Sequence, residues 1–186
     1  MSEYIDWNDR DIQQLAKQLR GECKRDSDIA KACFEYVRDS IKHSWDYKID
    51  TITCKASEVL KHKTGYCYAK SHLLAALLRA NQIPAGLCYQ RLSLENEGAP
   101  YCLHGLNAVY LQDFGWYRID PRGNKDGVDA QCFPPVEHLA FSTCGRLETD
   151  IQGVWVEPLP VIIKALTRYD TYMDVYQNLP DVEVYG

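Results

Sequence analysis

The sequence predicts an α+β fold, in which helices come first along the chain and an antiparallel sheet follows. Two observations support this prediction. Apolar residues recur every three or four positions through most of the first eighty residues, and after residue 85 they alternate roughly every second position. A chain of 186 residues is long enough to bury one sizeable core. We therefore expect a single domain over residues 1–186.

The first elements are expected to be two amphipathic helices. Their apolar faces hold Ile12, Leu15, Ala16 and Leu19 in the first helix, and Ile29, Ala30, Cys33, Val37 and Ile41 in the second. A turn-like stretch from Trp45 to Ile52 comes next, and a short helical segment from Lys55 to His62 follows it.

A central buried helix is predicted between Gly65 and Ala85. The run GYCYAKSHLLAALLRANQIPA is apolar almost all the way round a helix, which is typical of burial on most of its surface. The helix should end at Asn81 or Gln82, because Pro84 cannot continue it. Lys70 and His72 are expected at its surface.

The second half of the chain is expected to form an antiparallel meander and a closing helix. The strands are predicted at Gly86–Leu92, His104–Leu111 and Trp116–Ile119, with a further strand at Gly153–Glu157. Asp120 to Cys132 is expected to be a loop. The closing helix should run from Leu159 to Asn178, where Tyr172 or Tyr176 can border a binding site.

Composition argues against several classes of partner and cofactor. The net charge is −5 and no basic run is present, so neither nucleic acid nor an anionic membrane is expected as a partner. The N-terminus lacks the basic and apolar regions of a secretory signal, so we expect a cytoplasmic protein whose eight cysteines are free thiols. The cysteines form no C-x-x-C pair, and the stretch Asn124–Gly127 lacks carboxylates where a calcium loop needs them. No metal or cofactor is therefore expected.

Cys67 is the candidate nucleophile. It follows Gly65 and opens the predicted central helix, where the helix dipole favours a thiolate and unpaired backbone N–H groups can bind an oxyanion. Taken alone, Cys67 would be one more buried free cysteine.

A histidine and a carboxylate must come from elsewhere in the chain. His72 lies on the central helix but on a different side from Cys67. His104 begins a strand with Leu106 and Ala108 on its own face, and the next strand runs into Asp120. A carboxylate on a neighbouring strand would fix the imidazole so that its other nitrogen faces the thiol. Asp120 before Pro121 can also be read as a simple turn residue.

Three motifs resemble those of the transglutaminase-like superfamily, in particular its single-domain bacterial type. They are the nucleophile segment GYCYAKSHLLAALLRANQIPA, the histidine strand HGLNAVYL and the strand GWYRIDPRGN. Their order and separations agree with the family, and the resemblance covers about Lys55 to Asn124. It implies a papain-like fold with a Cys67, His104 and Asp120 triad.

Two features depart from the family pattern. Leu106 and Ala108 stand where the family's histidine strand usually has an aromatic and an acidic residue, which implies different substrate contacts there. The family's upstream aromatic residue, which helps to stabilise the oxyanion, has no clear motif in this sequence. Trp45, Tyr47 and Tyr66 are the side chains expected around the oxyanion or the substrate.

The triad also requires a particular pairing register in the hairpin between the strands His104–Leu111 and Trp116–Ile119. A four-residue turn that pairs Leu111 with Trp116 would place Asp120 opposite Asn107, which points away from His104. The triad requires a different register, such as Tyr110 paired with Trp116, or a β-bulge.

The expected chemistry is acyl transfer at an amide or peptide carbonyl through a Cys67 thioester. An amine acceptor would make the enzyme a transglutaminase or amide synthase, and water would make it a cysteine peptidase or amidase. Acetyl transfer to arylamines is less favoured, because nothing in the sequence suggests a coenzyme A site. The substrate is expected to be a protein, a peptide or a small amide. An alternative from another class is a catalytically inactive binding module of the same fold.

Overall fold

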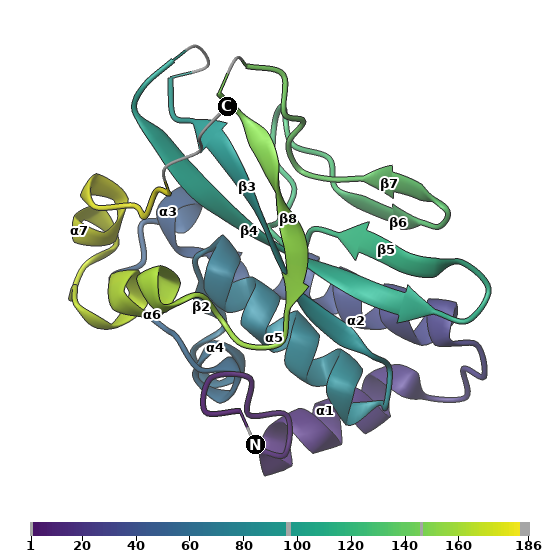
Figure 1. The fold of residues 1–186 in the computed structure, drawn as a ribbon. Coiled ribbons are helices and arrows are strands. Elements are labelled where there is room, and N and C mark those ends of the chain that lie inside the picture. The colour runs from purple at the N-terminus through teal and green to yellow at the C-terminus, as the bar shows by residue number, and fades with distance from the viewer. Residues whose placement is uncertain (1, 96–97, 146, 183–186) are drawn as a thin grey trace.

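The computed structural model describes residues 2–95, 98–145 and 147–182. Helices and strands form two main layers, as Figure 1 shows. The helices are α1 (Arg10–Arg20), α2 (Asp26–Ser40), α3 (Ser44–Tyr47), α4 (Ala56–His62), α5 (Cys67–Ala80), α6 (Pro160–Thr167) and α7 (Tyr172–Gln177). The strands are β1 (Lys42–His43), β2 (Thr64–Gly65), β3 (Ala85–Ser93), β4 (Tyr101–Leu111), β5 (Gly115–Ile119), β6 (Gln131–Phe133), β7 (Val136–His138) and β8 (Thr149–Trp155).

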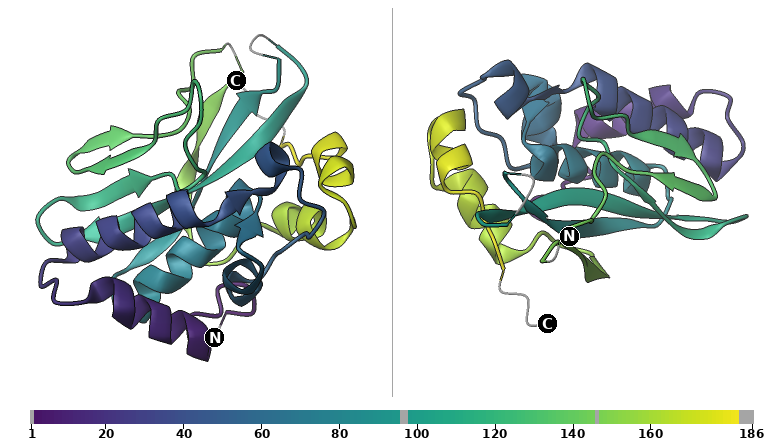
Figure 2. Two further views of the ribbon diagram at one scale, coloured as in Figure 1. Left: turned by 180° about the vertical axis from the view of Figure 1, so that it is seen from behind. Right: turned by 90° about the horizontal axis from the view of Figure 1, so that it is seen from above.

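The central helix α5 packs between the other N-terminal helices and the sheet. Every residue from 67 to 78 is buried, which confirms the burial expected from its apolar sequence. Contacts with α1, α2 and α4 cover one side of α5, and contacts with β3 and β4 cover the other. The right-hand view of Figure 2 shows these helices as one layer over one face of the sheet.

The expectation that Lys70 and His72 lie at the surface of α5 is wrong. Their exposed fractions are 0% and 1%. The Lys70 ammonium donates to the carbonyl oxygens of Arg38 and Ile41, and His72 Nδ1 lies 2.7 Å from the carbonyl oxygen of Cys54. Backbone carbonyls of neighbouring segments thus replace the water that these polar groups would otherwise need.

The antiparallel sheet has the strand order β5-β4-β3-β8. The predicted α+β class and the β3-β4-β5 meander are confirmed, although β4 begins at Tyr101 rather than at His104. The expected strand at Gly153–Glu157 is shifted, because β8 spans Thr149–Trp155 and pairs with β3 at the edge of the sheet.

Two pairs of short strands were not predicted. β1 and β2 form a parallel pair, and β6 and β7 form a hairpin, so strand structure starts at Gln131 where a loop to Cys132 was expected. Strands of two or three residues are too short to show an alternating pattern.

The expected helix from Leu159 to Asn178 is two helices, α6 and α7. The break between them is explained by Thr171, whose side-chain oxygen accepts a hydrogen bond from the backbone N–H of Asp174 at 3.1 Å and so caps a new helix. α7 contacts α3, and both lie at the same end of the sheet (Figure 1). None of the helices in the described ranges is long and apolar enough to cross a membrane.

Candidate active site

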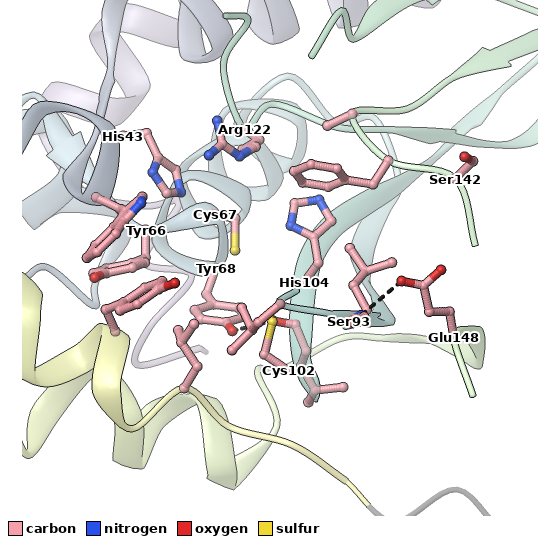
Figure 3. A pocket seen from close by; sticks show the side chains of 18 of the residues that line it. His43, Tyr66, Cys67, Tyr68, Ser93, Cys102, His104, Arg122, Ser142 and Glu148 are labelled. Carbon is pink, nitrogen blue, oxygen red and sulfur yellow. Dashed lines mark hydrogen bonds between the residues drawn. The ribbon is translucent and has the colours of Figure 1, made fainter. Parts of the chain in front are cut away.

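Cys67, His104 and several aromatic residues line one pocket of about 510 Å³. The pocket lies at the N-terminal end of α5, between this helix and β4. Figure 3 shows Cys67 and His104 with their side chains facing each other. Two of the three residues predicted for the triad therefore meet in a cavity, and the third lies directly behind His104.

Cys67 is the first residue of α5 and is 7% exposed. Gly65 lets the chain pack closely against Ala69 and Thr53 just before the helix begins, because a Cβ atom at this position would lie 2.9 Å from Ala69 Cβ and 3.1 Å from Thr53 Oγ1. The first turn of α5 carries no acidic residue that would offset the positive end of the helix dipole. The position therefore favours a negatively charged sulfur and oxyanion.

His104 lies between Cys67 and a buried carboxylate. Its Nε2 atom is 2.7 Å from Asp120 Oδ2, which leaves Nδ1 for Cys67. The Phe141 ring packs edge-on against the imidazole, with 5.0 Å between ring centroids. Burial lowers the pKa of His104, but the charges of Asp120 and Cys67 and hydrogen bonds to both outweigh it and raise this pKa to about 10. The imidazole is thus cationic at neutral pH, which places a positive charge beside the Cys67 sulfur.

Asp120 is completely buried. Its two carboxylate oxygens accept backbone N–H groups from Arg122 and Ala140, both at 3.1 Å, in addition to His104. Burial raises the pKa of Asp120, but His104 and these two N–H groups outweigh burial and hold the pKa below its usual value. The carboxylate is therefore ionised and held in place on both oxygens.

The hairpin register is the one that the triad requires. Tyr110 pairs with Trp116 and Leu111 with Gly115, so Ile119 lies opposite Asn107. Asp120, the next residue, comes level with Leu106 on the face that His104 shares. The prediction of this changed register is confirmed. The connecting loop has three residues, Gln112 to Phe114, because the ladder continues to the pair of Leu111 and Gly115.

The three aromatic residues expected around the oxyanion or substrate do not lie together. Trp45 and Tyr66 line the Cys67 pocket, but Tyr47 is 61% exposed and lines a neighbouring hollow. The Trp45 indole stacks on Tyr176 with 3.6 Å between ring centroids, and the Tyr66 hydroxyl donates to the carbonyl oxygen of Tyr172. Trp45, Tyr66 and Tyr176 all line the pocket and together form an aromatic wall, so Tyr176 borders the pocket as expected for one of the two tyrosines.

Two pocket residues were not singled out by the sequence reasoning. His43 and Arg122 both line the cavity and are 7% and 6% exposed. Arg122 binds the Asp46 carboxylate at 2.6 and 3.1 Å, and His43 Nδ1 lies 3.6 Å from the same carboxylate. His43 lies on a strand of two residues, so no periodic pattern marked it. Its proximity to Trp45, where an aromatic residue was sought, was the one available signal.

Residues 13–121 match the family model described as the transglutaminase-like superfamily. None of the curated proteins matches the sequence. Among solved structures, the chain is similar to a candidate cysteine protease from Cytophaga hutchinsonii, with a TM-score of 0.52 and 22% identity over 65% of this chain and 39% of that chain.

Two further solved structures are more distant. The periplasmic domain of TgpA from Pseudomonas aeruginosa matches with a TM-score of 0.45 and 18% identity, over 60% of this chain and 42% of that chain. Red sea bream transglutaminase matches with a TM-score of 0.46 and 13% identity, over 63% and 27%. The chain thus spans less than half the length of each of these three proteins. The Cytophaga protein has the same fold as this chain.

Proposed function

Because the chain belongs to the transglutaminase-like superfamily, we propose that it is a thiol-dependent acyltransferase acting on an amide or peptide carbonyl through a Cys67 thioester. The observation that supports this most is the convergence of Cys67, His104 and Asp120. The first two share a pocket, and Asp120 binds the far nitrogen of His104 at 2.7 Å.

The proposed reaction begins from a Cys67 thiolate and a His104 imidazolium. The sulfur attacks the carbonyl carbon, and the carbonyl π electrons move to oxygen. When the tetrahedral intermediate collapses, His104 gives its proton to the leaving amine and the acyl group remains on Cys67 as a thioester. Asp120 keeps the imidazole in the orientation that these proton transfers need.

The second half of the reaction uses an acceptor that carries a proton. Neutral His104 takes this proton as the acceptor attacks the thioester, and Cys67 leaves as a thiolate. An amine acceptor gives a new amide, as in a transglutaminase or amide synthase, whereas water gives the acid, as in a cysteine peptidase or amidase. Both outcomes restore the same pair of Cys67 and His104.

A two-stage experiment tests this proposal. First, the protein is mixed with p-nitrophenyl acetate, and intact-protein mass spectrometry should find one acetyl group, mapped to Cys67 and absent from Cys67→Ala. Second, a glutamine-containing peptide is supplied with or without a primary amine. Incorporation of the amine would identify a transferase, and release of ammonia without incorporation would identify an amidase. If neither donor acylates Cys67, the chain is an inactive binding module rather than an enzyme.

We also propose a cytoplasmic location and a protein, peptide or small-amide substrate. All eight cysteines are free, which is the usual state in a reducing compartment. Cell fractionation followed by thiol titration of the recovered protein tests the location. Recovery from the cytosol with all eight thiols reactive after unfolding would agree with it, and disulfide-linked peptides would contradict it.

A further inference from the structure

His43 is a second imidazole beside the nucleophile. The β1–β2 ladder pairs His43 with Gly65, two residues before Cys67. The ring of His43 packs edge-on against Tyr66, with 5.5 Å between ring centroids. In the view of Figure 3, the Cys67 sulfur lies between the rings of His43 and His104, and all three residues line one pocket.

One nitrogen of His43 is buried without a hydrogen bond. Nδ1 has no hydrogen-bond partner among the described residues, and the nearest carboxylate oxygen, Asp46 Oδ2, is 3.6 Å away and bound to Arg122 at 2.6 Å. A proton on Nδ1 would therefore have no acceptor within hydrogen-bond distance. With the proton on Nε2 instead, the Nδ1 lone pair faces the positive charge of the Arg122 guanidinium. This arrangement favours the tautomer with an Nε2–H group. Burial and the Arg122 charge hold the pKa of His43 well below its usual value, so the ring is neutral.

Three other polar side chains of the pocket already have partners. The hydroxyls of Tyr66 and Tyr68 donate to the carbonyl oxygens of Tyr172 and Leu103. The Arg122 guanidinium is paired with Asp46.

The Trp45 ring packs against α7. Its indole stacks on Tyr176 and also contacts the Tyr172 ring, at 5.8 Å between centroids. His43 instead packs against Tyr66, the residue that precedes Cys67. His43 therefore combines a neutral N–H group with a place beside the nucleophile, whereas the ring contacts of Trp45 are with α7.

We propose that His43 Nε2–H is the side-chain donor of the oxyanion hole and acts together with the backbone N–H of Cys67. This inference rests on the proposed function and replaces Trp45 and Tyr47 in that role. As the Cys67 sulfur attacks, the carbonyl π electrons move to oxygen and His43 donates a hydrogen bond to that oxygen without transferring its proton. The electron pair returns to the carbon when the amine leaves with the proton from His104, and His43 is unchanged.

The test compares two reactions of the same sulfur. Acylation of Cys67 by p-nitrophenyl acetate passes through an oxyanion, whereas alkylation by iodoacetamide does not. Removing one oxyanion donor typically slows a reaction by roughly 10²–10³. In His43→Ala, we expect acylation to slow by at least about tenfold, with alkylation within about threefold of the wild-type rate. His43→Gln, which keeps an N–H donor, should recover part of the acylation rate.

The control is His72→Gln, because His72 is also buried but does not line the pocket. It should leave both rates unchanged. Equal loss of acylation and alkylation in His43→Ala would overturn the inference, since His43 would then only hold the site together. Unchanged acylation would overturn it as well. If wild-type Cys67 is not acylated at all, the proposed function fails and this inference fails with it.

Discussion

Asp120 shows how strongly one buried carboxylate can set the chemistry of a site. It has no exposed surface and accepts hydrogen bonds from His104, Arg122 and Ala140. Burial alone would favour a neutral carboxyl group, but the adjacent imidazolium and the two N–H groups reverse that preference. The result is a fixed negative charge behind His104, on the side away from Cys67.

Asp120→Asn should change how stability depends on pH. The pKa of His104 in the folded protein is about 10, above its ordinary value of 6.5, so folding is favoured by His104 protonation. This contribution is complete below about pH 6.5 and is lost as pH rises through about 10. We expect it to amount to a few kcal/mol in the wild type and to be much smaller in Asp120→Asn, because the charge that raises the pKa is gone.

Urea unfolding at pH 6, 8 and 10 measures the difference in unfolding free energy between the wild type and Asp120→Asn. Both proteins share their other titrating groups, so the difference between their unfolding free energies isolates His104 and its partner. The difference should shrink as pH rises from 6 to 10. A difference that is constant over this range would contradict the assigned role of Asp120.

At the residue scale, the meeting of Cys67, His104 and Asp120 was predictable and their surroundings were not. Cys67, His104 and Asp120 each lie in a sequence motif, and the residues next to them in that motif also lie next to them in space. His43 and Lys70 depend on partners far along the chain, such as Arg122 for the first and the end of α2 for the second. A charged or polar residue can be recognised as buried only when those distant partners are known.

Among the elements, the contact between α5 and β4 determines the distance between nucleophile and base. Gly105 follows His104 and lies directly on the residue after Cys67. A Cβ atom at Gly105 would come within 3.1 Å of Tyr68 Cα and 3.3 Å of Tyr68 N. Both are backbone atoms, so a side chain at Gly105 can be accommodated only if the helix and the strand move apart.

Gly105→Ala should therefore lower both stability and reactivity. We expect a loss of about 1–3 kcal/mol, typical of overpacking, and slower alkylation of Cys67 in the protein that remains folded. Thermal unfolding and iodoacetamide kinetics measure the two effects.

The matched control for this prediction is Gly86→Ala. A Cβ atom at Gly86 would lie 2.4 Å from Val154 Cγ1 and 2.9 Å from the carbonyl oxygen of Trp155, in the β3–β8 contact away from the pocket. It should destabilise the fold but leave the alkylation rate of folded protein unchanged. Similar alkylation rates for Gly105→Ala and the wild type would show that this contact does not position the site.

The longer elements were predictable because periodicity needs several residues to show. α5 and the β3-β4-β5 meander were recognised in this way, and the register of β4 and β5 followed from the geometry that the triad requires. The short pairs β1–β2 and β6–β7 carry no such signal. The split between α6 and α7 depends on the Thr171 cap, which an apolar pattern running through both helices hides.

At the scale of the whole molecule, the pocket exists because separate parts of the fold meet at one end of α5. The helical layer supplies Cys67, and the sheet supplies His104. The C-terminal helix α7 closes the wall through Tyr176, whose ring stacks on Trp45 of α3. The segment around Phe141 covers the outer side of His104. The site thus combines residues from the helical layer, the sheet and the C-terminal helix α7.

Tyr176→Ala should open the aromatic wall without touching the triad. We expect KM for a peptide donor to rise several-fold and the iodoacetamide rate to stay within about threefold, because His104 and Asp120 are undisturbed. Loss of the stacked pair should cost about 0.5–1.5 kcal/mol of stability beyond the buried area. Tyr176→Phe keeps the stack and should behave like the wild type. Loss of alkylation in Tyr176→Ala would contradict this prediction, since it would show that α7 contributes to activation of the Cys67 thiol.

The central claim, that Cys67 is a nucleophile activated by His104, is tested most directly by competitive labelling of all eight cysteines with limiting iodoacetamide. Accessibility alone would favour Cys144, which is exposed, over Cys67, which is 7% exposed. If His104 activates Cys67, peptide mass spectrometry should find Cys67 labelled at least about tenfold faster than any other cysteine, and His104→Ala should abolish this advantage. Labelling that follows accessibility, with Cys144 first and Cys67 among the slow thiols, would contradict this claim.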